Sequence, residues 1–259
     1  MFVRMRFSIR VCIRSERGEL PLDYRQGFAS LLKAALKRSE PLLYTLWYQR
    51  KEEKPFTFAV YFPQLQSSLA GDKYLKVGEQ ALWNFSFADI EAGVRTLNAL
   101  GRLSKRMKAR SSAGPRRFGY AWRKQWEFVV DRILLPPPRR PIRSSRVVFR
   151  TLSPFLVNRH GASHQYLTPA EEDFLDALQF QVRELSQRWL GRPMELDLAR
   201  CEFGHLKRLP VWHYGQYMSA NKGTFILSGA PELLQLIYQA GLGVRRSQGF
   251  GMLEIVREL

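Results

Sequence analysis

The first half of the chain contains short stretches of alternating apolar and polar residues, separated by segments with helical spacing. Over residues 3–13, Phe7, Ile9 and Val11 alternate with polar side chains, which predicts a half-buried strand. Residues 24–38 place apolar side chains on one helical face, and Asp23 is the expected N-cap. Further predicted elements are strands over 55–62 and 73–87 with a turn at Gly78-Glu79, a helix over 88–100 with Ile90, Val94, Leu97 and Leu100 on its apolar face, and a strand over 126–135. This order is the ferredoxin-like pattern.

The second half repeats this order of elements after a proline run at residues 136–138, which is typical of a linker. A long helix is expected to begin at Thr168 as cap, with Pro169 at its first position. The remaining predicted elements are strands over 146–152, 194–203, 211–218, 223–228 and 250–257, and a short helix over 231–240. We therefore predict an α+β fold of two tandem ferredoxin-like domains, residues 1–140 and 141–259, from the order of elements alone.

Several classes of protein are disfavoured by the composition. The chain has no run of about 18 apolar residues that would predict a membrane helix, and its N-terminus lacks a signal-peptide pattern. Cys12 and Cys201 lie far apart, so we expect no disulfide framework or cysteine zinc site and a reducing cytoplasm. His160 and His164 are four residues apart, but Gly161 between them favours a loop, so we expect no metal or other cofactor. His205 and His213 are expected on the surface of a hairpin, where RNA contact is the alternative.

The positive charge is concentrated in one stretch. The chain has 41 Lys plus Arg and 23 Asp plus Glu, a net charge of +18. Residues 102–150 hold 15 basic and 2 acidic side chains, so 13 of the 18 net charges lie there, interleaved with Tyr120, Trp122 and Trp126. Cations for phosphates beside rings for bases indicate an RNA-binding surface; the alternative is a solvated face with a few core aromatics.

Residues 241–252 form the most specific local motif, in which four glycines flank two arginines between a helix and a strand. A dinucleotide fingerprint needs the glycines between a strand and a following helix, so the reversed order excludes that interpretation. Successive backbone N–H groups in such a loop can bind an anion. The candidate RNA contacts here are Gly241, Gly243, Arg245, Arg246, Ser247, Gly249 and Gly251.

This loop resembles the C-terminal glycine loop of the CRISPR repeat-processing endoribonucleases, the sixth CRISPR-associated protein family of the RAMP superfamily. Segments 20–24, 149–155, 166–169 and 223–229 also resemble that family, in the same order along the chain. The resemblance implies two ferredoxin-like halves, in agreement with the element order. It also implies a nuclease of antiviral defence that cleaves CRISPR repeat RNA without a metal. In that reaction the 2′-hydroxyl attacks the adjacent phosphorus, which leaves a 2′,3′-cyclic phosphate and a 5′-hydroxyl on the products.

Many members of the family supply a histidine just after the first helix, and this chain has none there. By the resemblance, Tyr48 stands at the histidine position, Lys33 at that of a supporting tyrosine and Lys54 at that of a lysine. Tyrosine with its ordinary pKa is a poor base at neutral pH, and Arg50 and Lys51 would lower that pKa. We therefore predict that Lys33, Tyr48 and Lys54 line the scissile phosphate, with Arg50 and Lys51 as substitutes.

Outside the loop, the predicted RNA contacts are Arg116, Arg117, Arg123, Lys124, Arg139 and Arg140. The segment 102–125 resembles the family least and is expected to be an insertion. The whole basic stretch, residues 102–150, is expected to provide much of the affinity for RNA and its salt dependence, while the loop and the first-helix segment set position and chemistry.

Alternatives remain open for each candidate. Lys33 and Lys54 could be solvated residues, Tyr48 a core aromatic beside Trp47, and the loop arginines a means of packing against the first half. For function, the alternative is a non-catalytic or slow CRISPR RNA-binding subunit of an effector ribonucleoprotein, which the absent histidine favours. A monomer or a homodimer fits the sequence.

Overall fold

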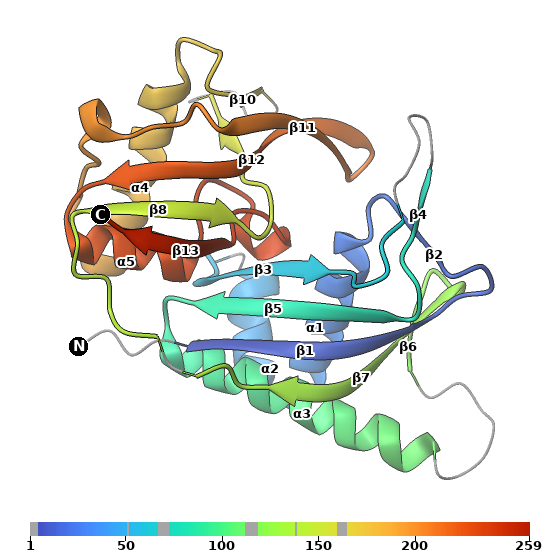
Figure 1. The fold of residues 1–259 in the computed structure, drawn as a ribbon. Coiled ribbons are helices and arrows are strands. Elements are labelled where there is room, and N and C mark those ends of the chain that lie inside the picture. Colours follow the sequence, from blue (N-terminus) through green and yellow to red (C-terminus); the bar gives the residue numbers. More distant parts are fainter. Residues whose placement is uncertain (1–4, 51, 67–72, 112–118, 138, 160–164) are drawn as a thin grey trace.

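The computed structural model describes residues 5–50, 52–66, 73–111, 119–137, 139–159 and 165–259. Two mixed layers of helix and sheet lie one above the other in Figure 1. The elements of the first are β1 (Met5–Arg14), β2 (Glu19–Pro21), α1 (Arg25–Ser39), α2 (Pro41–Tyr44), a π-helical turn (Thr45–Gln49), β3 (Phe56–Tyr61), β4 (Tyr74–Lys76), β5 (Gln80–Phe87), α3 (Ile90–Ser111), β6 (Tyr120–Trp122) and β7 (Trp126–Leu134). Its antiparallel sheet has the order β3-β5-β1-β7-β6.

The second layer repeats this plan. Its elements are β8 (Arg146–Thr151), β9 (Val157–Asn158), β10 (Tyr166–Leu167), α4 (Phe174–Leu190), a 3-10 turn (Leu198–Arg200), β11 (Leu206–His213), β12 (Gln216–Ser228), α5 (Pro231–Ala240), a second 3-10 turn (Arg246–Gln248) and β13 (Leu253–Glu258). The sheet order β11-β12-β8-β13 matches β3-β5-β1-β7 of the first half strand for strand. The prediction of two tandem ferredoxin-like folds is therefore confirmed, while the division at residue 140 stays a prediction.

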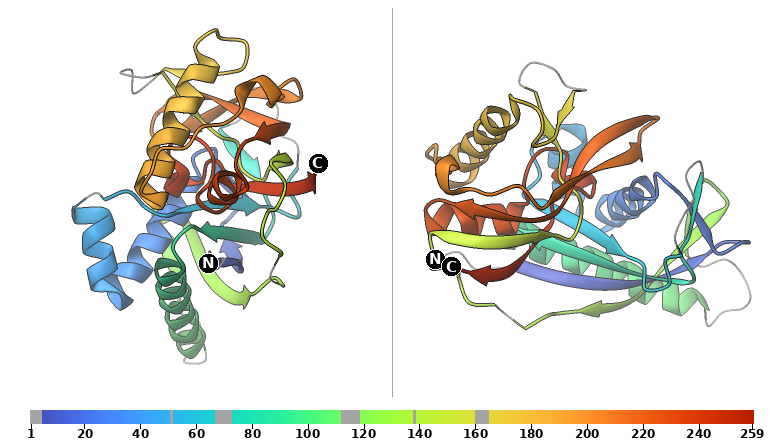
Figure 2. Two further views of the ribbon diagram at one scale, coloured as in Figure 1. Left: turned by 90° about the vertical axis from the view of Figure 1, so that its left-hand side faces the viewer. Right: turned by 45° about the horizontal axis from the view of Figure 1, so that its top comes forward.

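Each half has its own apolar core. Phe7, Phe28 and Phe85 are among the buried side chains of the first, and Phe149, Leu178 and Ile237 among those of the second. In Figure 2, helix α4 (gold) lies on the far side of the second half from helix α3 (green). The seam between the halves is formed by α5 against β3 and β5, and by the 3-10 turn of the glycine loop against β3 and α1.

The predicted N-cap at Asp23 is wrong. Tyr24 precedes the first residue of α1, and no side chain caps that end of the helix. The Asp23 carboxylate instead accepts a hydrogen bond from Arg123, 100 residues away, at 2.7 Å. A long-range ion pair has replaced the local cap.

The predicted start of the long helix is also wrong. Helix α4 begins at Phe174, and the backbone N–H and hydroxyl of Thr168 both donate to the Glu171 carboxylate, the former at 2.7 Å. That contact closes a separate turn ahead of the helix, because the glutamate three residues on satisfies Thr168 as a capping box would.

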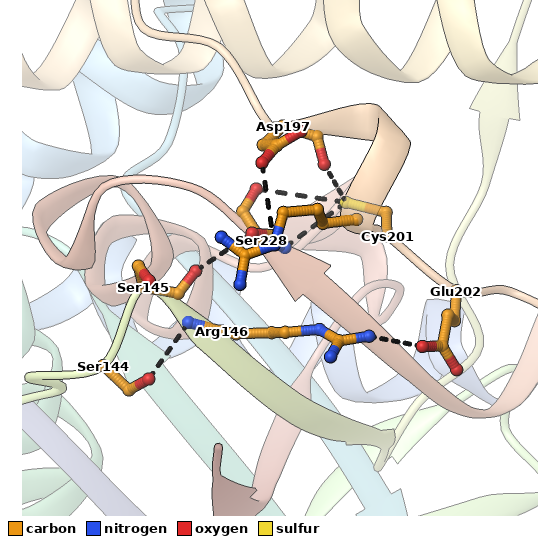
Figure 3. A network of polar contacts seen from close by, with 8 residues as sticks. Ser144, Ser145, Arg146, Asp197, Cys201, Glu202 and Ser228 are labelled. Carbon is orange, nitrogen blue, oxygen red and sulfur yellow. Dashed lines mark hydrogen bonds and ion pairs between the residues drawn. The ribbon is translucent and has the colours of Figure 1, made fainter.

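No strand covers residues 194–203 as predicted. Leu196 and Glu202 form isolated bridges to β12, with a 3-10 turn between them. Figure 3 shows what holds this segment: the backbone N–H of Ser228 donates to the Cys201 sulfur at 3.3 Å, and Arg146 is ion-paired with Glu202. Side-chain contacts therefore replace a regular ladder here.

Helix α3 is longer than predicted, and only part of its predicted apolar face is buried. Leu100 is buried and Leu97 packs against the core as expected, whereas Ile90 and Val94 are each 41% exposed. The helix continues to residue 111, and residues 120–122 form an edge strand, so most of the segment 102–125 is regular structure.

Candidate functional site

The glycine loop, residues 241–252, is clamped against the first half by hydrogen bonds to its backbone. The Thr57 hydroxyl donates to the carbonyl of Phe250 at 2.7 Å, and Arg25 Nε donates to the carbonyl of Gly249 at 3.1 Å. Thr57 lies on β3, which begins just after Lys54, and Arg25 lies on α1, which carries Lys33. The loop is therefore held by elements that also position two of the predicted catalytic residues.

The four glycines of the loop are required by this packing. All four have φ between 77° and 92°, a region that other residues rarely adopt. A Cβ at Gly243 would lie 2.2 Å from the Leu156 carbonyl oxygen, and one at Gly251 would lie 2.1 Å from that of Leu242. At Gly241 and Gly249 it would press on Thr57 and on the Phe58 ring. Their contact with RNA stays a prediction.

The two loop arginines have different environments. Arg245 is half-buried, and its guanidinium donates to the Tyr166 hydroxyl at 2.7 Å. Arg246 is only 10% exposed and is ion-paired with Glu53 of the first half. The pairing of Arg246 corresponds to the alternative in which a loop arginine packs the two halves together.

Lys33, Tyr48 and Lys54 come together. The ammonium groups of Lys33 and Lys54 lie 5.4 and 5.1 Å from the centre of the Tyr48 ring. Lys33 comes from α1, Tyr48 from the π-helical turn and Lys54 from the segment before β3. A single π-turn is rare and is frequent at functional sites, and here it presents the ring to both lysines. Arg50, at the end of the turn, is exposed, and Lys51 lies outside the described residues.

Burial controls the protonation of this cluster. It raises the pKa of Tyr48 well above its usual value, with smaller contributions from Tyr214 and Tyr44, so the phenol is neutral at physiological pH. The pKa of Tyr48 is thus shifted in the direction opposite to the expected lowering, because burial dominates. Burial also lowers the pKa of Lys54, which increases the fraction of neutral amine.

A hollow of about 460 Å³ lies beside the glycine loop, and of the three clustered residues Lys54 lines it. The lining has three cations, Lys54, Arg245 and Arg246, and three carboxylates, Glu52, Glu53 and Glu184, together with Ser247 of the loop and Gln181 of α4. Because Arg246 is paired with Glu53, Lys54 and Arg245 are the cations that can face an anionic phosphodiester there.

His213 is a buried residue, contrary to the expected surface position. It is 1% exposed, its Nε2 lies 3.1 Å from Gln248 Oε1, and its ring packs on Phe250. Burial, with smaller effects of Arg25 and Arg245, lowers the pKa of His213 to about 4, so the imidazole is neutral at pH 7. His205 is exposed, and His160 and His164 lie outside the described residues.

The cations predicted in the basic stretch lie elsewhere. Among the described residues, none of them lines the hollow. Arg123 pairs with Asp23, Lys124 follows it with positive φ, Arg139 donates to the Ile255 carbonyl at 2.8 Å, and Arg140 is exposed. Arg116 and Arg117 lie outside the described part of the chain.

A second cavity between the halves, of about 620 Å³, was not predicted. Arg6, Asn84 and Arg139 line it together with Gln239, which is 1% exposed. Within the described chain, neither amide atom of Gln239 has a hydrogen-bond partner. Gln239 lies in the buried part of α5. No sequence pattern predicts that its amide lacks a partner.

The described residues contain no cluster of three or more His, Cys, Asp or Glu side chains that could hold a metal ion. In the same residues, no helix is long and apolar enough to cross a membrane.

The chain has two tandem ferredoxin-like halves joined at a seam by a glycine-rich loop. Comparisons with solved structures find the same fold. The structure of the product of a Cas6-related gene from Pyrococcus furiosus superimposes with a TM-score of 0.77 at 19% identity, over 99% of this chain and 100% of that one. A RAMP protein described as binding different RNA substrates gives 0.76 at 18% identity, over 98% and 100%.

The sequence comparisons agree with this likeness. Residues 135–255 match the family model "CRISPR associated protein Cas6, C-terminal". The CRISPR-associated endoribonuclease Cas6 of Pyrococcus furiosus is 23% identical over 97% of this chain and 90% of its own length. Residues 135–255 are therefore similar to the C-terminal part of Cas6, and the chain as a whole is similar to a Cas6 endoribonuclease over most of its length.

Proposed function

We propose that this protein is a metal-independent endoribonuclease that cleaves CRISPR repeat RNA into guide RNAs with 2′,3′-cyclic phosphate and 5′-hydroxyl ends. The observation that carries the proposal is the pair of lysines around Tyr48, of which Lys54 lines the same hollow as Arg245 and Ser247 of the glycine loop. The homologous Cas6 from Pyrococcus furiosus is an endoribonuclease, which supports the same activity here.

Lys54 is the group best suited to act as the base. Its lowered pKa gives it a larger neutral fraction than an ordinary lysine, so its amine can accept the 2′-hydroxyl proton. The alkoxide then attacks phosphorus, and the bond to the 5′ oxygen breaks. Lys33 and Arg245 stabilise the additional negative charge on the phosphorane.

Tyr48 acts as a hydrogen-bond and proton donor in this scheme. With its pKa raised, the phenol keeps its proton at neutral pH and cannot serve as base. It can donate that proton toward the departing 5′ oxygen, and it holds the two ammonium groups by their attraction to its ring.

A slow or non-catalytic RNA-binding subunit of a CRISPR effector complex is the second candidate. The observation that favours it is the neutral, mostly buried phenol at the position where a histidine is expected. Such a protein would bind repeat RNA tightly and leave it intact.

The test is single-turnover cleavage of labelled repeat RNA with and without EDTA. We expect EDTA-resistant cleavage at one phosphodiester, and no cleavage when the 2′-hydroxyl at that position is replaced by hydrogen. Binding without any cleavage would establish the second candidate instead. Alanine variants of Lys33, Arg50, Lys51 and Lys54, together with Tyr48→Phe, assign the roles; unchanged rates in all five would refute the site.

A further inference from the structure

Glu53 is the residue of the first half that pairs with the glycine loop. Its carboxylate pairs with the guanidinium of Arg246, and its second oxygen lies 3.9 Å from Arg188 Nε on helix α4. Glu53 itself is 41% exposed, whereas the Arg246 side chain is 10% exposed. Two elements of the second half therefore converge on one carboxylate of the first.

Loss of the ion pair between Glu53 and Arg246 is energetically unfavourable. Burial lowers the pKa of Arg246 and the Glu53 carboxylate opposes that effect, which is the behaviour of a buried cation held charged by its partner. Because arginine does not lose its proton in proteins, removal of the carboxylate leaves an uncompensated buried charge. Arg246 Nη1 also donates to the Gly243 carbonyl at 3.1 Å, so the guanidinium is fixed within the loop.

Glu53 directly precedes Lys54, the proposed base, in the chain. The Lys54 ammonium lies 5.1 Å from the centre of the Tyr48 ring, and Lys54 lines the hollow with Arg245 and Ser247. Anchoring Glu53 on the loop thereby fixes the backbone that carries Lys54 and the distance between the two sides of the hollow.

We propose that Glu53 is a positioning residue, whose ion pair with Arg246 docks Lys54 against the glycine loop and so assembles the cleavage site from both halves of the protein. The inference rests on the proposed endoribonuclease function. It assigns Arg246 to the assembly of the site and leaves Arg245 and Ser247 to face the RNA. Loss of the pair should then slow the chemical step and leave RNA affinity unchanged.

The experiment compares Glu53→Gln and Arg246→Gln with the wild-type protein in two separate assays, RNA binding and single-turnover cleavage at saturating protein. We expect the cleavage rate to fall about 10- to 100-fold, since small displacements of catalytic groups have effects of that size. The dissociation constant should change less than about twofold, because the Arg246 side chain is nine-tenths buried and held by Glu53 rather than presented to RNA. Arg246→Lys, which keeps the charge, should recover most of the rate.

Glu232→Gln is the matched control. Glu232 pairs with Arg192 at 2.6 Å within the second half and is 39% exposed, close to the exposure of Glu53. We expect this variant to cleave and bind as the wild type does. Hydrogen exchange of segments 52–56 and 241–251 in the RNA-free proteins tests docking without cleavage. Both segments should exchange faster in Glu53→Gln and Arg246→Gln, and at the wild-type rate in Glu232→Gln.

The outcomes separate the two proposals. A wild-type protein that cleaves, with Glu53→Gln as fast as Glu232→Gln, overturns the positioning role. Weaker RNA binding at an unchanged saturating rate also overturns it and makes Arg246 an RNA contact. A wild-type protein that binds without cleaving refutes the endoribonuclease function, and the exchange rates then decide whether Glu53 docks the segment.

Discussion

The basic stretch, residues 102–150, and the glycine loop, residues 241–252, differ in how their charge is used. The stretch holds 15 basic side chains, but the folded chain brings acids from elsewhere to several of them: Arg102 pairs with Glu40, Arg123 with Asp23, Arg146 with Glu202 and Arg150 with Glu254. The loop holds two arginines, and both lie at a seam where burial strengthens each interaction.

The comparison shows that the amount of charge and the place of chemistry are separate properties. A dense surface field raises the encounter rate and the affinity for a polyanion over a wide area. Cleavage needs a few groups within a few ångströms of one phosphorus, and the groups proposed for it come from α1, the π-turn, the segment before β3 and the loop. Variants that change one property and leave the other intact test this division.

The largest effect is expected from Lys54→Arg, which keeps the positive charge and cannot release its proton at these pH values. Loss of a general base costs about 10²- to 10⁴-fold in rate. Because burial lowers the pKa of Lys54, the wild-type rate should rise with pH at values below those of an ordinary lysine, and the variant should lose this rise. Single-turnover rates between pH 6 and 9.5 measure both.

Lys105→Arg is the control for that variant, since Lys105 is an exposed cation of the basic stretch. It should leave the rate and its pH dependence unchanged. A Lys54→Arg protein that retains the wild-type profile would remove Lys54 from the chemistry.

The next largest effect is a loss of stability when the packing of the glycine loop is disturbed. Gly243→Ala places a Cβ 2.2 Å from a carbonyl oxygen at a φ of 79°, and it should cost about 3 kcal/mol or more of unfolding free energy. Gly191→Ala has a similar φ of 74° with nothing within 4 Å, and it should cost only about 1 kcal/mol. Urea denaturation of both variants measures the difference; an equal cost in both would mean that the loop can yield.

Local patterns predicted most elements of the fold because strands such as β1 alternate and helices such as α1 have one buried face. They failed where another side chain engaged the expected cap. Asp23 pairs with Arg123, 100 residues away, and Thr168 is satisfied by Glu171 in a turn ahead of α4.

The candidate site shows the same limit. The resemblance to a family grouped Lys33, Tyr48 and Lys54 as candidates, and the structure brings those three together. Sequence could not supply the burial that raises the pKa of Tyr48, the pairing of Glu53 with Arg246, or the burial of His213 under the loop. Each depends on docking between the halves, which no short-range pattern encodes.

A smaller effect is expected when the basic stretch is neutralised. Replacing Arg116, Arg117, Arg123 and Lys124 by glutamine should weaken RNA binding about tenfold at physiological salt, because fewer counterions are released. For single-stranded RNA, the slope of log affinity against log salt should become shallower by about 0.7 for each phosphate that the variant no longer neutralises. Cleavage at saturating protein should stay near the wild-type rate.

The matched control replaces Arg183, Arg192, Arg200 and Arg257 of the second half, which removes the same charge from elsewhere. Its salt slope should stay close to that of the wild type. An equal decrease in affinity in both proteins would mean that total charge, and not the basic stretch, governs binding.

The smallest effect concerns His213, which joins the loop to the β11–β12 hairpin and remains neutral when buried. Arg25 and Arg245 oppose its protonation, Asp23 and the bond to Gln248 favour it, and burial prevails, so the folded-state pKa is about 4. The unfolded chain, with a histidine pKa near 6.5, therefore binds more protons at pH 5, and stability falls as pH decreases through this range. We expect His213→Gln, which cannot titrate, to lose about 1 to 2 kcal/mol less than the wild type between pH 7.5 and 5. Denaturation curves of both proteins at both pH values give this difference directly, and because other acid-titrating groups are shared, an identical pH dependence would mean that His213 is protonated as easily in the folded protein as in the unfolded chain.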